Sequence, residues 1–136
     1  MTLEVVEYDD AWPARFTAEA DQIRAALGAQ LRRIEHVGST AVPGLAARPV
    51  VDIAISVEDL DAVDVAAYER PGFDVNVYEL EPEEFLDHVR LRDYLRTHPE
   101  DRDAYGALKR RLAHDDAAYE NAKSEFVGRL VAALRR

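Results

Sequence analysis

IEHVGSTAVPGLAARPVVDI, residues 34–53, is the stretch that decides the fold. Its first residues belong to a short strand expected over 32–37, which leads into the turn Gly38-Ser39-Thr40. The run Val50–Val57 that follows is β-branched and apolar almost throughout, which is typical of a central strand buried on both faces. Asp52 is the one charged residue in that run. The sequence therefore predicts a turn and a carboxylate on neighbouring strands.

Helical periodicity precedes this strand pair, and a mixed pattern follows it. A helix is expected over 10–27, with Asp9 or Asp10 as its cap, because apolar residues recur on one face at Trp12, Phe16, Ile23 and Leu27. Residues 59–68 fit a short helix, and residues 73–78 alternate between apolar and polar, as in a half-buried strand.

The last third of the chain has a helical period. Three helices are expected from Glu83 onward, and the second begins at the capping box Thr97-His98-Pro99-Glu100. The predicted fold class is therefore α+β, a small mixed sheet packed by an N-terminal helix and C-terminal helices. A length of 136 residues fits a single domain over 1–136.

Composition excludes several classes of protein. An apolar fraction of 48% supplies a core and excludes wholesale disorder, and no run approaches the roughly 20 apolar residues that cross a bilayer. The absence of cysteine excludes disulfides, thiolate zinc sites and cysteine nucleophiles. The first residues lack the basic and apolar blocks of a signal peptide, so we expect a soluble, cytoplasmic protein without a membrane partner.

The net charge of −10 comes from one segment. Residues 58–87 hold eleven acidic residues and one basic residue, Arg70, whereas the rest of the chain is balanced. Such an acidic segment repels phosphate backbones and disfavours nucleic acid as a partner. Two interpretations stay open: a solvated surface that keeps the protein soluble, or a site for a cation or a basic partner.

Two features of residues 38–52 carry chemistry. The turn Gly38, Ser39 and Thr40 allows close backbone approach and offers hydroxyls, so it either cradles a phosphate or serves as an ordinary turn. A carboxylate in an apolar strand, such as that of Asp52, is destabilising by several kcal/mol unless it is paired, coordinated or at the exposed end of the strand. It is therefore either paired, with Arg48, Arg92 or a cluster of N–H groups as partner, or part of a site where a Mg²⁺ ion bridges it to a phosphate.

Four residues outside the turn and the strand of Asp52 are candidates for binding or supporting roles. His36 precedes the turn and either orients it through a ring hydrogen bond or acts as a charged donor near a phosphate. His88 and Arg92 are one helical turn apart and bind an anion, pair with Asp52, or pack a polar helix face on the sheet. The ammonium group of Lys109 is either solvated or bound.

Residues 34–53 closely resemble the signature of the GrpB (UPF0157) family, and residues 85–96 with His98-Pro99-Glu100 resemble its second signature. The resemblance covers nearly the whole chain. It implies a reduced nucleotidyltransferase-like fold and leaves the substrate open. It also implies that relatives occur fused to dephospho-CoA kinase.

The chain departs from the pattern that this resemblance implies. Ala54 stands where the superfamily carries a second carboxylate, which the resemblance implies that the family generally lacks. Asp74 is expected to supply a second oxygen ligand facing Asp52, and it shares a strand face with Asn76. The chain also lacks a strand or hairpin between Arg70 and Phe73, which narrows the expected sheet and leaves an edge strand through which a homodimer could form.

Two hypotheses follow. In the first, a GrpB-family protein binds a nucleotide or another phosphate-bearing small molecule with Mg²⁺, and nucleotidyl transfer through Asp52 as the catalytic residue is an open extension. Phosphate would be bound by Gly38, Ser39, Thr40, Arg48 and Arg92, supported by His36 and His88, and the metal by Asp52 and Asp74. In the second, the domain is a non-catalytic binding or interaction module that retains the fold.

Overall fold

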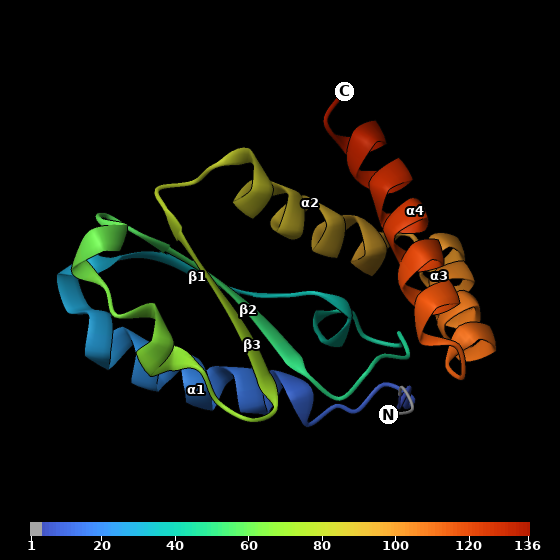
Figure 1. Ribbon diagram of the computed structural model, residues 1–136, viewed down its shortest axis with the longest axis horizontal. Helices are drawn as coiled ribbons and strands as arrows, with labels where there is room; N and C mark the ends of the chain where they lie inside the picture. The colour runs from blue at the N-terminus through green and yellow to red at the C-terminus, as the bar shows by residue number, and fades with distance from the viewer. Residues whose placement is uncertain (1–3) are drawn as a thin grey trace.

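The computed structural model describes residues 4–136 and has the predicted α+β architecture (Figure 1). Its helices and strands, in chain order, are α1 (Trp12–Leu27), β1 (Leu31–Val37), β2 (Val51–Val57), β3 (Phe73–Glu79), α2 (Glu83–Thr97), α3 (Pro99–Leu112) and α4 (Asp116–Leu134). Short 3-10 helices connect some of these elements. Among residues 4–136, no helix has both the length and the apolar character needed to cross a membrane.

The sheet is mixed, as the sequence predicts, and its strands lie in the order β1-β2-β3. β1 pairs with β2 in antiparallel fashion, and β3 pairs with β2 in parallel. β2 is central, and every residue in it except Asp52 is buried. Its apolar run therefore fills the middle of the sheet, where both faces are covered.

The two faces of β2 pack against different helices (Figure 1). Val51, Ile53, Ile55 and Val57 face α1 and form one core cluster with Trp12 and Ile23. Ala54 belongs to the opposite cluster, with Val37 and with Phe85 of α2. Because side chains alternate along a strand, Asp52 lies on the same face as Ala54, toward the C-terminal helices.

A third cluster joins α2 to α3 and α4 beyond the end of the sheet (Figure 1). Val42 and Leu45, from the segment between β1 and β2, pack there against Leu95 and Tyr105. This packing places the C-terminal helices next to the turn that leaves β1.

Several local predictions differ from the structure. The first helix begins at Trp12 rather than Asp10, and its N-cap, Ala11, has no side-chain cap; the Asp9 carboxylate accepts the Ala11 N–H at 2.9 Å. The expected helix over 59–68 is two short 3-10 helices, Leu60–Ala62 and Val65–Tyr68.

The capping box at the start of α3 does not form. The Thr97 hydroxyl donates to backbone carbonyls of its own helix, at Asp93 and Tyr94, rather than to the next helix. His98 is the N-cap of α3 and makes no side-chain capping bond. The prediction was wrong because a hydroxyl at the end of one helix has its own carbonyls within reach.

Candidate functional site

The turn after β1 lies directly against Asp52. Val37 is the register partner of Asp52, so the chain leaves β1 beside that carboxylate. Gly38 has φ +73, and a Cβ built there would lie 2.9 Å from Cγ of Asp52 and closer still to its Oδ2. A side chain at position 38 and a carboxylate at position 52 therefore exclude each other.

A second carboxylate faces Asp52 from the neighbouring strand. Asp52 and Asp74 are register partners in the parallel pair of β2 and β3. Burial first, and then the charge of Asp74, raises the pKa of Asp52 to about 7, and a hydrogen bond between the two carboxyl groups adds to the shift. Lys123 and Lys109 act in the opposite direction. Near pH 7 the Asp52 carboxyl group is therefore only partly ionised, whereas an ordinary aspartate would be fully ionised.

A buried lysine completes this end of the sheet. Lys109 of α3 is only 3% exposed; its ammonium group donates to the Ser39 hydroxyl and lies 4.4 Å from the ring centroid of Tyr105. Burial, and then the charge of Lys123, lowers its pKa to about 7, although Asp52 opposes this shift. Near neutral pH, Asp52 and Lys109 therefore both titrate within one small volume.

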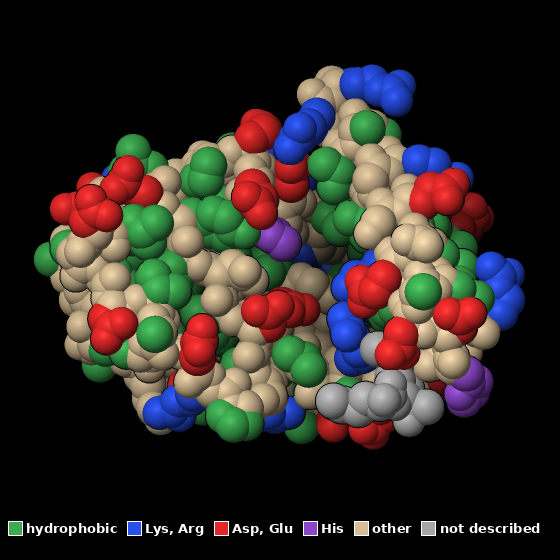
Figure 2. All heavy atoms as spheres, in the orientation of Figure 1, with side chains coloured by type: hydrophobic (Ala, Val, Ile, Leu, Met, Phe, Trp, Pro, Cys, Tyr) green, Lys and Arg blue, Asp and Glu red, His purple; other side chains and the backbone are tan. Residues whose placement is uncertain are grey.

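Two cavities, of about 320 and 230 Å³, meet at these groups. Residues common to both linings are Ser39, Asp52, Asp74 and Lys123. The larger cavity adds Arg48, Lys109 and Tyr119, and the smaller adds His88, Arg92 and Tyr105. Figure 2 shows the surface hollowed between the sheet and the C-terminal helices, where acidic and basic side chains meet. We call the joined space the double cavity.

Lys123 is the site residue that the sequence analysis missed, and Lys109 is one that it left undecided. A signal was present: each lysine follows a buried tyrosine by four residues, Tyr105 in α3 and Tyr119 in α4. Residues four apart share a helix face, so an inward tyrosine carries its lysine inward with it.

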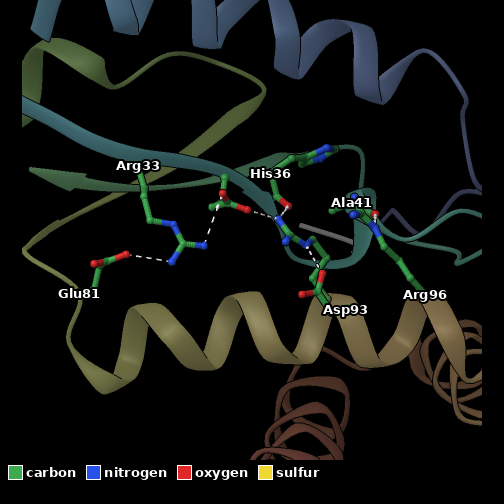
Figure 3. A network of polar contacts seen from close by, with 8 residues as sticks. Arg33, His36, Ala41, Glu81, Asp93 and Arg96 are labelled. Atoms are coloured by element: carbon green, nitrogen blue, oxygen red, sulfur yellow. Dashed lines mark hydrogen bonds and ion pairs between the residues drawn. The ribbon is translucent and has the colours of Figure 1, made fainter. Parts of the chain in front are cut away.

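The guanidinium group of Arg92 contacts other groups of the protein. Its Nη1 lies 2.6 Å from the Glu35 carboxylate and 3.1 Å from the carbonyl oxygen of His36, and its Nε lies 3.0 Å from Asp93. Arg96 similarly donates to the carbonyl of Ala41 at 2.8 Å. Figure 3 shows these contacts joining α2 to β1 and to the turn beyond it. A phosphate at Arg92 would compete with this network.

Of the alternatives left open for Asp52, the salt bridge is not formed. Among residues 4–136, Asp52 makes no ion pair with Arg48, Arg92 or any other base. Arg48 instead lies over the ring of Tyr119 at 5.7 Å and 3.7 Å from Glu120, at the wall of the larger cavity. Within the described residues the partly buried Asp52 carboxylate therefore has no basic partner, and a bound cation would supply a positive charge there.

His36 and Thr40 serve the turn itself. The ring Nε2 of His36 and the hydroxyl of Thr40 are 2.9 Å apart, and the ring stacks on Phe16 with centroids 4.9 Å apart. Burial, then the charges of Arg96 and Arg92, lowers the pKa of His36 to about 4, so it is neutral at pH 7. A neutral ring that contacts the Thr40 hydroxyl agrees with the orienting role.

We expect Arg92→Met to lower the free energy of unfolding by about 2–3 kcal/mol, because the Glu35 carboxylate and the His36 carbonyl lose their donor. Urea unfolding at pH 7 measures this change. The matched control is Arg24→Met, which removes an exposed ion pair to Asp21 and should change the free energy by less than about 0.5 kcal/mol. Equal effects of the two variants would contradict the clamping role of Arg92.

The fold and the double cavity define an α+β protein that holds a carboxylate pair against a Gly-Ser turn. The chain belongs to the GrpB family: the family model described as "GrpB protein" matches residues 2–76 and 65–133. The architecture is also consistent with the nucleotidyltransferase-like superfamily that the signature implies.

Similar proteins come from several bacteria. A UPF0157 protein of Halalkalibacterium halodurans is 34% identical over 154 aligned positions, which cover 93% of this chain and 79% of that protein. The crystal structure of the conserved protein GrpB from Enterococcus faecalis superposes with a TM-score of 0.84 at 27% identity, covering 98% of this chain and 100% of that one. A dephospho-CoA kinase of Mycolicibacterium paratuberculosis is 42% identical over 65 residues, 46% of this chain and 16% of that protein.

The comparisons also support the expected shortening of the chain. The alignment with the Halalkalibacterium protein has 154 positions, more than the 136 residues of this chain, so this chain has gaps in it. The two matches to the family model meet and overlap over residues 65–76, directly before and into the start of β3. This is where the sequence predicts a missing strand or hairpin.

Proposed function

We propose that the double cavity binds a nucleotide or another small phosphate-bearing molecule together with one Mg²⁺ ion. The observation that carries the proposal is that groups for a cation and groups for an anion line the same space. Asp52 and Asp74 supply carboxylate oxygens, and Ser39 and Lys123 lie in both linings beside them. A metal–phosphate unit offers both charges at the matching separation of a few ångströms.

Phosphate would be bound on the side of the C-terminal helices. Lys109, Lys123 and Arg48 bring positive charge there, and Ser39 brings a hydroxyl. Lys109 gains most from an anion, because burial now disfavours its charged form. The glycine at position 38 leaves the backbone of the turn open to close approach.

Mg²⁺ would be held by Asp52 and Asp74. Burial and the charge of Asp74 raise the pKa of Asp52, so a divalent cation in place of the Asp52 proton removes the repulsion between the two carboxyl groups. Mg²⁺ commonly uses one or two carboxylates plus phosphate oxygens and water, and this donor set fits one ion. Among residues 4–136 no group of three or more candidate ligands occurs, which does not fit a two-metal site. The bound ion would neutralise and polarise a phosphate oxygen.

Binding rather than nucleotidyl transfer is what the residues support. Ala54 is fully buried in the cluster with Val37 and Phe85. The position where the superfamily carries a second carboxylate is therefore part of the apolar core here. Nucleotidyl transfer is not part of the proposal.

Calorimetric titration tests the proposal with ATP, CTP, GTP and pyrophosphate, each with and without Mg²⁺. We expect binding that needs Mg²⁺ and is strongest near pH 7, because Asp52 must lose its proton to hold the ion whereas Lys109 must keep its proton to bind the phosphate. Silence with all four compounds would contradict the proposal and favour the second hypothesis, an interaction module.

Lys109→Met tests the role of the Lys109 charge in phosphate binding without a large loss of packing, because methionine keeps much of the length and apolar character of the side chain. We expect phosphate affinity to fall about 10- to 100-fold, since a charge-assisted hydrogen bond is lost. Lys109 has a lowered pKa in the folded state, so its burial makes wild-type stability rise with pH between about 7 and 10.5, and the variant should lose that rise. Unchanged affinity in a folded variant would contradict a role for Lys109.

A further inference from the structure

The outer edge of β3 carries unpaired backbone groups. In the ladder with β2, the Val51 N–H donates to the carbonyl of Gly72, and the Leu80 N–H donates to the carbonyl of Val57. With the parallel register, these two bonds show that the N–H and C=O groups of the even-numbered residues of β3 point toward β2. The N–H and C=O groups of Val75 and Val77 therefore point away from the sheet. Within residues 4–136 they have no hydrogen-bond partner.

Exposed acidic side chains surround this edge. Those between residues 58 and 87 that make no ion pair within the described part of the chain are Asp59, Asp61, Asp64, Glu69, Asp74, Glu79 and Glu84. The one base of the segment, Arg70, is engaged with Glu19 at 3.4 Å. Figure 2 shows acidic side chains over the part of the surface where β3 and the segment before it lie in Figure 1.

The edge is also where this chain differs from its family. The matches to the family model overlap over residues 65–76, so the residues that relatives insert would precede β3. An edge strand with open backbone groups is a template for a further strand. In this chain the edge of β3 is unpaired at the place where relatives insert additional residues.

We propose that the outer edge of β3 binds an extended, lysine- or arginine-rich segment of a partner protein as a fourth strand. The backbone of that segment would pair with Val75 and Val77, and alternate side chains would meet the acidic surface. A second copy of this chain fits less well, because pairing two β3 edges brings two sets of unpaired acids together.

The probe is a fluorescein-labelled peptide of alternating valine and lysine, titrated with the full chain and followed by fluorescence anisotropy. We expect the valine–lysine peptide to bind with an affinity that falls as the salt concentration rises. The matching valine–glutamate peptide should not bind. A valine–lysine peptide N-methylated at alternate amides keeps its charge but cannot pair as a strand. It should bind at least about tenfold more weakly, and equal binding would overturn the proposal. Hydrogen exchange should slow at Val75 and Val77 when the unmodified peptide binds.

A matched pair of proline variants tests the protein side. Val77→Pro removes an outward N–H and leaves the ladder to β2 intact, whereas Val65→Pro places the same residue at the first position of a 3-10 helix in the same acidic segment. We expect Val77→Pro to lose peptide binding at least about tenfold and Val65→Pro to keep it. Equal binding by both variants would overturn the proposal. So would a sedimenting dimer of the free chain that Val77→Pro dissociates, because the occupant would then be a second copy.

Discussion

Gly38→Ala will lower the free energy of unfolding by about 3–5 kcal/mol, which is the largest stability effect that we expect from one methyl group in this protein. Two causes combine. The backbone at position 38 has φ +73, and the added Cβ would overlap the Asp52 carboxylate. Urea unfolding monitored by circular dichroism measures the change.

Gly28→Ala is the matched control for this variant. Gly28 also has a positive φ, +54, but a Cβ there meets nothing within 4 Å. Its cost is backbone strain alone, about 1–2 kcal/mol. Asp52→Ala should relieve part of the cost of Gly38→Ala, because Cγ and both carboxylate oxygens are then gone. Equal costs at positions 28 and 38, or no coupling between positions 38 and 52, would contradict the contact.

Asp52→Asn will stabilise the free protein at alkaline pH and abolish Mg²⁺-dependent binding. The folded protein keeps the Asp52 proton up to about pH 7, whereas an unfolded chain releases it near 3.8. Between these two pH values only the unfolded chain loses the proton, so the free energy of unfolding falls progressively as the pH rises across that range. Asparagine cannot ionise, so we expect a gain of about 2 kcal/mol at pH 8 and little change at pH 4. A substitution that raises stability and abolishes binding is typical of a functional site.

Asp87→Asn provides a control of opposite sign. A hydrogen bond from Arg135 lowers the pKa of Asp87, so that carboxylate stabilises the folded protein above its ordinary pKa and loses this effect as the pH falls. The substitution should lower stability at pH 8 and matter little at low pH. A change of the same sign in both variants would contradict the opposite environments that we assign to Asp52 and Asp87.

The parts of the fold that local pattern decides could be predicted from the sequence. The β-branched run around Ile53 identified the central strand, and its lone carboxylate identified the face with unusual chemistry. The proximity of Gly38 and Asp52 followed because the short segment between two paired strands brings their ends together. Asp74 was placed opposite Asp52 through the family resemblance and the alternation of strand faces.

Contacts between distant elements could not be predicted in the same way. Lys109 meets Ser39 across 70 residues, and Arg92 meets Glu35 across 57, so no local spacing encodes either pair. Charge alone favoured Arg92 as a ligand for phosphate, because its carboxylate partner becomes visible only when α2 lies against β1. The tyrosine–lysine spacing in α3 and α4 was available, but its meaning depends on which helix face turns toward the cavity.

The structure of the chain crystallised with Mg²⁺ and a non-hydrolysable nucleotide tests the central claim most directly. Our account predicts a metal ion on Asp52 and Asp74 that also contacts a phosphate oxygen, with the phosphate near Ser39 and Lys109. A nucleotide bound outside the double cavity, or one bound inside it while the two carboxyl groups still share their proton and no metal is present, would contradict the account.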